Sequence, residues 1–562
     1  MTPRPGDGGP AHLPVVVVGG GPVGVTAASL LGAAGVPALV LERERDVYHL
    51  PRAAHLDDEV MRIFQSLGVA EEVLVHTRPM ASMQVVDANR RVLLRFPRSR
   101  HGPYGYPAAN MFHQPAVEQV LRTAATERHG VTLRTGSEVA RVEQTAGAVR
   151  VHARERDTSS EFVMDADFVL ACDGARSPIR EALGIALRGR RFSQRWLVLD
   201  AVVEGGLAGF PHAQQVCDPR RPATYVPMGG PRYRWEFQML PGERTEDLTD
   251  PPVLARLLAP WVERSRVRID RTASYTFRAV AAERWRVGRI FLLGDAVHQM
   301  PPFLGQGLCA GIRDAHNLAW KLALVVAGRA DPAVLDTYEG ERAPHVAGIT
   351  RRAVLFGGVM QGGGRGGHGM RWLASRAALG VPGLRRLIER QQVPGLRPGP
   401  LLPAAVRGPG MGGRLLPQPV VMLPDGTPTR LDHVLGPGFA LIGFGSDPLG
   451  DSTPEARADW ERLDVLPVTV TPPAAAPHAH AVNDVTGVLT DWAARHRASS
   501  VLVRPDRYIF GVAGTHPRAA PSPDHLAVLL RRALRRPAQG EAPPFGSGSF
   551  YSAARYTSMK RR

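Results

Sequence analysis

Cysteine is scarce in this chain. Only Cys172, Cys217 and Cys309 occur among its 562 residues, and no two of them have the C-x-x-C spacing. This excludes a disulfide framework and a zinc site, and it favours a reducing, cytoplasmic compartment. Long apolar runs are lacking as well, since residues 1–14 contain no signal-peptide stretch and no run reaches the roughly 18 residues of a membrane helix. We therefore expect a soluble, cytoplasmic protein with no metal and no membrane partner.

Dense blocks of like charge are also missing, although the formal net charge is +17. Arginines are spread along the whole chain, often near Asp or Glu, and the tract Leu530–Arg536 has the pattern of a solvated helix face. Aromatic residues are not interleaved with the basic ones, as a nucleic-acid surface requires. We expect attraction for anionic substrates and no nucleic-acid partner. An apolar content of 44% in a chain of this length indicates three or four globular domains.

The most informative stretch lies near the start of the chain. Val15–Val18 predicts a buried parallel strand, and Gly19, Gly21 and Gly24 then form G-x-G-x-x-G ahead of an Ala/Leu-rich helix. These glycines allow a tight turn, close approach of a pyrophosphate and close helix–strand packing. The helix N-terminus is expected to hold the pyrophosphate, with Pro22 and Val23 in the same turn.

A second predicted strand, Ala38–Leu41, ends in Glu42, which is followed by Arg43. An acid near this offset, about 20 residues on, binds a ribose hydroxyl. A carboxylate there disfavours an additional ribose phosphate, so the expected dinucleotide is FAD or NAD. The alternative is a glycine-rich turn in an ordinary α/β unit.

The following segments supply further candidates. Pro51 opens a predicted helix that runs to Gly68, and Arg52 beside it is placed for a phosphate contact or is simply solvated. A hairpin is predicted over 83–96, and a helix over 116–125 follows Pro115. Strands are predicted at 131–134, 139–142 and 149–153, and the strand that begins at Phe162 ends in Asp173-Gly174.

Residues 190–285 differ in character from the flanking segments. Aromatic-rich strands are predicted at 196–203, 223–226 and 233–240, which indicates an inserted antiparallel sheet that could form one wall of an aromatic substrate's site. A buried strand at 288–293 then leads into Gly294-Asp295, and Asp295 could accept a hydrogen bond from a sugar hydroxyl. The side-chain-poor loop that follows, from Pro302 through Gly305 and Gly307 to Leu308, lets the backbone approach a flat ring.

The last third of the chain is predicted to be a separate α/β module. The Gly-rich stretch 362–368 and the Pro/Gly-rich run 393–413 indicate linkers. Strands are expected at 440–444, 465–470, 500–503 and 508–512, with helices at 488–496 and 524–535. We divide the chain into an FAD- or NAD-binding domain (12–185 and, after the insertion, 286–400), an inserted sheet domain (186–285), a C-terminal domain (414–540) and a flexible tail (541–562).

Three motifs in this order resemble the group A flavoprotein aromatic hydroxylases, of the para-hydroxybenzoate hydroxylase type. They are the glycine motif at 19–24, Cys172-Asp173-Gly174 and Gly294-Asp295-Ala-Val-His298, and the similarity extends from residue 13 to about 400. The stretches 51–59, 112–115 and 300–321 are most similar to 3-(3-hydroxyphenyl)propionate hydroxylases. The resemblance implies an α/β fold: a Rossmann-like FAD-binding domain, an inserted mostly antiparallel substrate sheet and a thioredoxin-like C-terminal domain.

The resemblance also implies a role for each matching position. Gly19, Gly21 and Gly24 line the FAD pyrophosphate, with Glu42 on the adenosine ribose. Arg52 and Gln114 match contacts to the flavin's linker, and Asp173-Gly174 matches a motif associated with both FAD and the nicotinamide cofactor. Asp295 matches the aspartate on the ribityl chain, and Pro302 with residues 305–308 matches the loop beside the isoalloxazine. Val297 departs from the family, which usually has alanine there.

The implied reaction uses NADH or NADPH to reduce FAD. O2 then adds to the flavin C4a, and the hydroperoxide hydroxylates a phenol ortho to its hydroxyl. The implied substrate is 3-(3-hydroxyphenyl)propionate or 3-hydroxycinnamate, in aromatic catabolism. No second G-x-G-x-x-G has strand–helix context, so no separate nicotinamide domain is expected. Without a cysteine after Cys309, the C-terminal domain is expected to serve packing or homodimer formation.

Several points stay open at this level. A hydrogen-bond acceptor must activate the phenol, and His113 and His298 are visible candidates, although a lone histidine is more often structural. The choice between NADH and NADPH is also open. A disulfide reductase lacks its cysteine pair here, and a halogenase lacks its W-x-W-x-I-P segment. Hydroxylation of a polycyclic aromatic polyketide or another phenol remains an alternative, as does a non-catalytic flavin-binding interaction protein.

Overall fold

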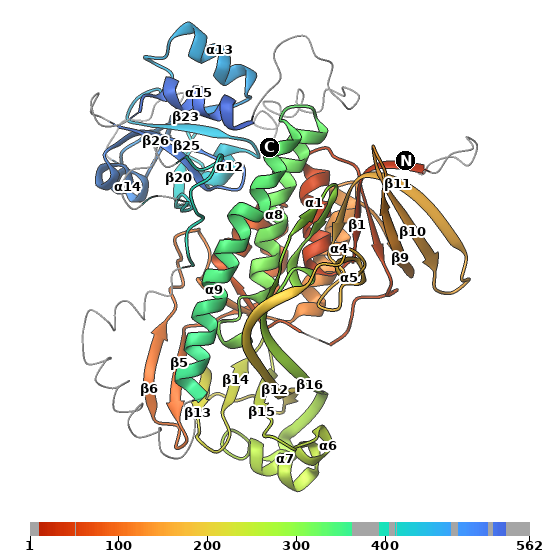
Figure 1. The fold of residues 1–562 in the computed structure, drawn as a ribbon. Helices are drawn as coiled ribbons and strands as arrows, with labels where there is room; N and C mark the ends of the chain where they lie inside the picture. The colour runs from red at the N-terminus through yellow and green to blue at the C-terminus, as the bar shows by residue number, and fades with distance from the viewer. Residues whose placement is uncertain are drawn as a thin grey trace.

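The computed structural model describes residues 11–50, 52–361, 393–403, 411, 413–473, 481–514 and 521–534. Pro51, the predicted linker at 362–368, most of 404–412 and the predicted tail at 541–562 lie outside the described residues. Figure 1 shows one β-sheet beside the long helices α8 (Gly307–Val326) and α9 (Thr337–Gln361), a second sheet near the lower end of α9, and the C-terminal module at the opposite end from the second sheet.

The first sheet is Rossmann-like. Its strands run in the order β17-β18-β11-β1-β2-β8, with β10 and β9 attached to β11. The central strand β1 (Ala11–Val18) pairs in parallel with β2 (Ala38–Glu42) and β11 (Glu161–Ala171), and α1 (Pro22–Ala33) connects β1 to β2. The chain passes from β1 to β2 on one side, and the later strand β11 lies on the other side of β1. Sheets of this kind bind ligands in the crevice at the carboxyl end of the strand where the order reverses.

The remaining elements of this part cover and extend the sheet. They are β8 (Thr132–Thr135), β9 (Ser137–Gln144), β10 (Val149–Glu155), β17 (Arg286–Val287), β18 (Ile290–Leu292), α4 (Gln114–Arg128), α5 (Pro178–Ala182), α8 (Gly307–Val326), α9 (Thr337–Gln361) and the short 3-10 helices η2 (Gly294–Ala296), η3 (Pro302–Leu304) and η4 (Pro332–Asp336). The predicted strands at 131–134, 139–142 and 149–153, and the strand predicted to begin at Phe162, are confirmed in type.

The helix predicted over 51–68 is wrong in its first part. His55–Asp57 forms strand β3, and the helix α2 begins at Asp58 and ends at Ser66. The Asp57 side chain caps the helix by accepting a hydrogen bond from the Val60 N–H at 3.1 Å. Local periodicity could not show this, because β3 pairs with the distant β7 (Ala109–Phe112). The helix α3 (Ala70–Val75) follows α2, and β4 (Thr77–Pro79) completes this small sheet.

The second sheet is mostly antiparallel and has the order β19-β16-β12-β15-β14-β13-β5-β6. Its long strands β12 (Leu187–Val203) and β16 (Val267–Ala282) pair along most of their length. The others are β5 (Ser82–Asp87), β6 (Val92–Pro97), β13 (Ala213–Cys217), β14 (Ala223–Pro227), β15 (Arg232–Gln238) and β19 (His298–Gln299). The predicted hairpin over 83–96 therefore joins this sheet, through a parallel pairing of β5 with β13. The predicted boundaries of the inserted sheet domain, at residues 186 and 285, stay a prediction.

The two faces of this sheet have different neighbours. One face carries an apolar core with Leu199, Tyr225 and Trp235, and α6 (Thr245–Thr249) and α7 (Pro251–Leu258) contribute Leu248, Leu254 and Leu258 to it. The opposite face is turned toward α9 and the flavin-domain loops, as contacts of α9 with β13 and β16 show. The sheet thus borders the site as predicted, but most aromatic residues of the predicted strands, Tyr225, Tyr233, Trp235 and Phe237, lie in the core of the other face, and Trp196 packs on the site side with Phe303.

The C-terminal module has a seven-stranded sheet of order β21-β20-β24-β23-β22-β25-β26. Its elements are β20 (Val420–Met422), β21 (Pro428–Arg430), α12 (Leu431–Leu435), β22 (Ala440–Phe444), α13 (Pro454–Arg462), β23 (Leu466–Thr471), β24 (Ala481–Asn483), α14 (Val488–His496), β25 (Ala498–Val503), β26 (Ile509–Gly514) and α15 (Pro523–Leu534). The parallel pair β22–β23 and the antiparallel strands β25 and β26 give the thioredoxin-like arrangement. The predicted strands and helices of this module are confirmed.

Buried polar contacts fasten this module to the rest of the molecule. Arg62 on α2 donates to both oxygens of Asp432 on α12, at 2.6 and 2.7 Å. Arg504, just after β25, contacts Glu341 on α9 at 2.8 Å. The Tyr508 hydroxyl donates to Glu59 of α2 at 3.1 Å. The module is thus packed against the helices that carry the candidate site.

Candidate active site

The glycine turn after β1 leaves no room for side chains where backbone segments meet. Gly19 has a positive φ of 104°, and a Cβ on Gly24 would lie 2.0 Å from the Gly19 carbonyl oxygen. At Gly21, in contrast, a Cβ would meet no atom within 4 Å, so this side of the turn is open. Gly21 is the N-cap of α1, and no side chain caps the helix there. The first N–H groups of α1 are therefore available to an anion.

Glu42 lies at the end of β2 against this turn. It is buried, and its carboxylate accepts hydrogen bonds from the N–H groups of Gly20 at 2.6 Å and Glu44 at 2.8 Å. Two backbone donors fix the carboxylate beside the glycine turn, which is the position an acid needs to reach a ribose. Arg43 is directed elsewhere: its side chain is exposed and lies 3.4 Å from the Glu44 carboxylate.

The structure brings Arg52 and Gln114 together from distant parts of the chain. The Gln114 side-chain oxygen accepts hydrogen bonds from the N–H groups of Arg52 at 2.9 Å and Ala53 at 2.7 Å. The Arg52 guanidinium is exposed and lies over the Tyr48 ring, 4.9 Å from its centroid. Gln114 therefore fixes the backbone of the loop that presents Arg52.

Asp173 and Gly174 follow β11 at the same edge of the first sheet. One Asp173 oxygen accepts a hydrogen bond from the Ile179 N–H at 3.2 Å, and the other has no partner among the described residues. Burial raises the pKa of Asp173, while a hydrogen bond from Ser177 opposes the rise. Gly174 has a φ of 85°, so the turn depends on glycine.

Gly294 and Asp295 pack on the start of α1. A Cβ on Gly294 would lie 3.2 Å from Val23, which also lies close to Gly311 of α8. The Asp295 side chain is exposed to solvent, yet the protein mass around it raises its pKa, with His298 and Arg52 acting in the opposite direction. Because the carboxylate is accessible, a polyhydroxylated chain can reach it.

The loop from Pro302 to Leu308 is held against β3. Gly305 has a φ of 64°, and a Cβ there would lie 2.9 Å from His55. His55 is in hydrogen-bond contact with the Gly305 carbonyl oxygen at 3.2 Å, and Gln306 donates to Asp57 at 3.1 Å. Burial lowers the pKa of His55 to about 4, so its ring is neutral near pH 7. Gly307 and Leu308 begin α8, partly accessible to solvent.

These groups fit an extended dinucleotide with a flat ring. The uncapped α1 N-terminus with open space at Gly21 fits a pyrophosphate, buried Glu42 fits a ribose, and accessible Asp295 fits a ribityl chain. Within the described part of the chain, no cluster of His, Cys, Asp or Glu could hold a metal ion. The helices described also include none with the length and apolar character needed to cross a bilayer.

Comparison with known proteins decides the family. The FAD binding domain family model matches residues 12–353, and the HcaD C-terminal domain model matches residues 413–524. The chain belongs to the FAD binding domain family.

Two curated relatives support this over nearly the whole chain. The 3-(3-hydroxy-phenyl)propionate/3-hydroxycinnamic acid hydroxylase 2 of Burkholderia vietnamiensis is 37% identical over 509 residues, covering 88% of this chain and 92% of that protein. The probable NADH-specific resorcinol 4-hydroxylase of Rhodococcus jostii is 36% identical over 520 residues, covering 91% and 94%. Among solved structures, the flavin-dependent monooxygenase PieE in complex with FAD and substrate has a TM-score of 0.79 at 25% identity, covering 94% of this chain and 99% of PieE.

The protein is therefore an FAD-dependent aromatic hydroxylase with a nicotinamide electron donor. The fold predicted from the sequence, a Rossmann-like domain with an inserted sheet and a thioredoxin-like C-terminal domain, is confirmed.

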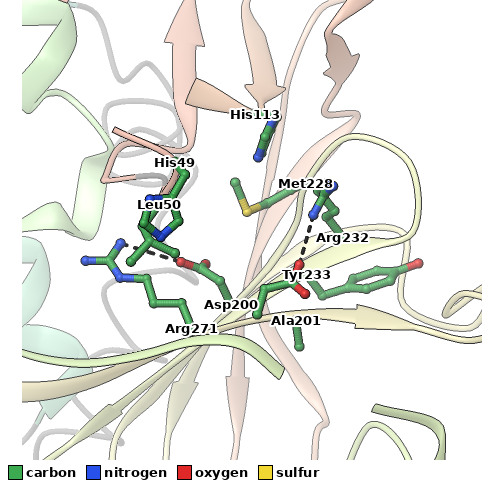
Figure 2. A pocket seen from close by; sticks show the side chains of 10 residues that line it. His49, Leu50, His113, Asp200, Ala201, Met228, Arg232, Tyr233 and Arg271 are labelled. Atoms are coloured by element: carbon green, nitrogen blue, oxygen red, sulfur yellow. Dashed lines mark hydrogen bonds and ion pairs between the residues drawn. The ribbon is translucent and has the colours of Figure 1, made fainter. Parts of the chain in front are cut away.

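The two histidine candidates of the hydroxylase differ in accessibility. His298 is only 1% exposed, and its Nε2 lies 2.7 Å from Asp314 in the core, so the interpretation of His298 as an acceptor for substrate is wrong. His113 is half-buried and lines a small cavity of about 40 Å³, which Figure 2 shows beside His49, Arg232 and Arg271. Burial and the charge of Arg232 lower the pKa of His113.

Sequence reasoning missed the polar residues of the hydroxylase's second sheet. Asp200, Arg234 and Arg271 lie on three adjacent strands, and Arg234 donates to both Asp200 oxygens, at 2.7 and 3.0 Å. Gln215, Thr224 and Glu236 lie one row away on the same face. The available signal was the strict alternation in β15, where Glu236 stands between Trp235 and Phe237 and so must face the other way.

Proposed function

We propose that this hydroxylase converts 3-(3-hydroxyphenyl)propionate or 3-hydroxycinnamate into the corresponding 2,3-dihydroxy compound, consuming NADH or NADPH and O2. The observation that carries the choice of a carboxylated phenol is the concentration of positive charge formed by Arg52, Arg234 and Arg271 where the second sheet meets the flavin-domain loop. The names of the curated relatives in Burkholderia support the same substrate class.

The charges are arranged around one carboxylate. Arg234 forms a bidentate ion pair with Asp200, and the Arg271 guanidinium lies 3.7 Å from the same carboxylate. Arg234 also donates to the Arg52 carbonyl oxygen at 2.8 Å, which ties the sheet to the flavin loop. Burial lowers the pKa of Arg271, and Arg234 and Arg52 lower it further. Asp200 opposes this fall in the pKa of Arg271. A buried cation whose charge is disfavoured by burial and by neighbouring arginines is stabilised by an incoming anion.

The cavity in Figure 2 is next to this cluster. Arg271 and Asp200 point into it from the sheet, and His49 and Leu50 cover it from the flavin-domain loop. Arg232, on the same rim, lies 2.9 Å from Asp270. A carboxylate seated here would leave its aromatic ring over the neighbouring row of the sheet.

We also propose roles for the predicted cofactor residues. The redox chemistry, acceptance of hydride from the nicotinamide and activation of O2, belongs to bound FAD. The following residues hold it: Gly19, Gly21, Pro22, Val23 and Gly24 at the pyrophosphate, Glu42 and Arg43 at the adenosine ribose, Arg52 and Gln114 at the linker, Asp173 and Gly174 in a motif associated with both FAD and the nicotinamide cofactor, Gly294 and Asp295 at the ribityl chain, and Pro302, Gly305, Gly307 and Leu308 at the ring. Among these, Glu42 has the supporting hydrogen bonds described above and Asp295 has an accessible carboxylate. The Arg43 side chain is directed toward Glu44, so its role would be limited to its backbone.

The chain's own residues have three tasks in this reaction. The arginine cluster orients the substrate by its carboxylate. An aromatic cluster excludes water on the other side of the site: Trp196 and Phe303 are buried, with ring centroids 5.8 Å apart, and Phe192, Phe277 and Phe356 pack around them. A hydrogen-bond acceptor must take the phenolic proton, because a phenolate is the more nucleophilic ring.

A second candidate is hydroxylation of a phenol without a carboxylate. The relative in Rhodococcus jostii, a probable NADH-specific resorcinol 4-hydroxylase, is about as similar as the first. The name of this relative also supports NADH rather than NADPH as the electron donor. A polycyclic phenol remains an alternative of the same reaction type. We further propose a cytoplasmic enzyme without nucleic-acid partners, in which the domain bounds given above hold and a homodimer can form.

Substrate screening with a matched pair of variants tests this choice. Purified enzyme is assayed for NADH consumption and product with 3-(3-hydroxyphenyl)propionate, resorcinol and a naphthacene-type phenol. We expect Arg271→Met to raise the KM of the carboxylated phenol about 10- to 100-fold, as loss of a charged hydrogen bond predicts, and to leave resorcinol unaffected. The control Arg268→Met, an exposed arginine on the same strand, should change neither. If Arg271→Met changes the KM of both substrates equally, or changes neither KM, Arg271 does not bind the substrate carboxylate.

A further inference from the structure

The second sheet carries a polar row in the middle of its site-facing side. Glu236 on β15 pairs with Val198 on β12 and with Thr224 on β14, and Thr224 pairs with Gln215 on β13. The Thr224 hydroxyl donates to the Gln215 side-chain oxygen at 2.8 Å. The neighbours of Glu236 in sequence, Trp235 and Phe237, belong to the apolar core of the opposite face. Strand alternation therefore directs Glu236 toward the flavin domain.

Two apolar clusters border this row. On one side, Trp196 and Cys217 pack with Phe303 of the flavin loop. On the other side, Met83 and Ala213 pack with Met111 of β7. Phe303 lies in η3, beside the predicted flavin-ring loop, so the row lies next to the place where we expect the flavin ring. In Figure 1 the strands β13, β14 and β15 lie beneath the end of α9.

Glu236 is buried without a partner. Its side chain is 7% exposed, and among the described residues no donor is hydrogen-bonded to its carboxylate. Burial raises the pKa of Glu236 to about 7, Arg234 opposes the rise and Asp200 adds to it. The titratable group that β13 brings to this face, Cys217, stays protonated because burial raises its pKa to about 12. An unpaired buried carboxylate costs stability, so its presence at such a place points to function.

We infer that Glu236 is a catalytic residue that binds the phenolic hydroxyl of the substrate and accepts its proton, with Thr224 and Gln215 positioned beside it. The inference rests on the proposed function only in requiring a phenol, and it holds for whichever phenol the enzyme accepts.

The step balances without any further reactant. The phenolic O–H bond breaks, its electron pair stays on the phenol oxygen, and the proton forms an O–H bond with a Glu236 carboxylate oxygen. No oxidation occurs in this step. The negative charge moves from the carboxylate to the phenol oxygen and its ortho carbon, which is then the nucleophile. The carboxylated tail of the proposed substrate points toward Arg271, one row away, and so away from Glu236.

The test compares Glu236→Gln with wild type on phenols of increasing acidity. The holoenzyme is assayed by kcat/KM from pH 5.5 to 9 on the preferred phenol and on its ring-fluorinated analogues. In wild type we expect activity to rise with pH through a group near pH 7. Removing a general base typically lowers the rate 10²- to 10⁴-fold. We therefore expect Glu236→Gln to lower kcat/KM about 100-fold or more and to abolish the rise of kcat/KM near pH 7. Fluorinated phenols that are already ionised should recover most of the loss.

Two further variants keep the result interpretable. Glu204→Gln, an exposed glutamate just after β12, should behave as wild type. If Glu236→Gln fails to retain FAD, Glu236→Asp replaces it and should give an intermediate rate with the pH-dependent limb retained. An equal loss on all phenols with an unchanged pH profile would show a structural role only and overturn the inference, as would no loss at all. A wild type that prefers resorcinol would contradict the proposed substrate and leave the Glu236 comparison to be made on resorcinol.

Discussion

Individual atoms set the conditions for binding the dinucleotide. The Gly24 position has no room for a methyl group, whereas the Gly21 position is open, and this contrast within one turn separates packing from ligand approach. Glu42 is held by two backbone donors and so is oriented before the ligand arrives. These features follow from residue spacing, which is why the glycine turn and its acid could be predicted from the sequence.

Gly24→Ala is expected to abolish FAD binding. The new Cβ would lie 2.0 Å from the Gly19 carbonyl oxygen, so the turn must shift out of its phosphate-binding shape. The ratio of flavin to protein absorbance after purification measures the effect. Gly209→Ala is the control, because a Cβ there meets no atom within 4 Å. A Gly24→Ala protein with a full complement of FAD would contradict this account of the turn.

Glu42→Gln is expected to weaken FAD binding about 10- to 100-fold, the range for losing a hydrogen bond to a charged group. Titration of the deflavinated protein with FAD, followed by flavin fluorescence, gives the Kd. The exposed neighbour Glu44 provides the comparison, and Glu44→Gln should change the Kd by less than about threefold. Similar Kd values for both variants would remove Glu42 from the ribose site.

Elements that depend on local sequence were predicted well, and those that depend on distant partners were not. The helix Val488–His496 and strand Ala440–Phe444 have the predicted bounds. Strand β3 was missed because it pairs with β7, more than fifty residues away. The long β16 was missed because charged residues interrupt its apolar pattern. The Asp200–Arg234–Arg271 cluster could not be predicted, since it requires the register of three strands.

Contacts between elements also account for the attachment of the C-terminal module. Asp432→Asn leaves the buried Arg62 charge without its carboxylate, which typically costs about 3–5 kcal/mol. We expect a correspondingly lower urea midpoint. The exposed pair Arg188–Glu283 is the matched control, and Glu283→Gln should cost no more than about 1 kcal/mol. Equal midpoints for the two variants would show that the module contributes little through this contact.

At the scale of the whole molecule, buried titratable groups make stability depend on pH. Burial lowers the pKa of His55 and His316 to about 4, below the unfolded value of 6.5. Positive partners lower the pKa of Glu341 and Asp432 to about 2, against the effect of burial. Because the pKa of each of these four groups is lower in the folded protein, each group takes up its proton at a higher pH in the unfolded chain than in the folded protein. Their contribution is therefore present above the unfolded pKa values and is lost as pH falls.

We accordingly expect the melting temperature to fall in two stages as pH decreases. The histidines act between about pH 6.5 and 4, and the carboxylates act from about 4.5 downward. Calorimetry from pH 8 to 3 measures both stages. Asp432→Asn should reduce the second stage, because it removes one of the two carboxylates that titrate there. A melting temperature that is constant from pH 7 to 4 would contradict this reading of the buried network.

The most direct test of the central claim, hydroxylation of 3-(3-hydroxyphenyl)propionate by an FAD-dependent enzyme, is a turnover under ¹⁸O₂. The account predicts that the purified yellow protein consumes one NADH for each 2,3-dihydroxy product and that the product carries one ¹⁸O atom. NADH oxidation that yields only hydrogen peroxide, or a colourless protein that takes up no FAD, would contradict it.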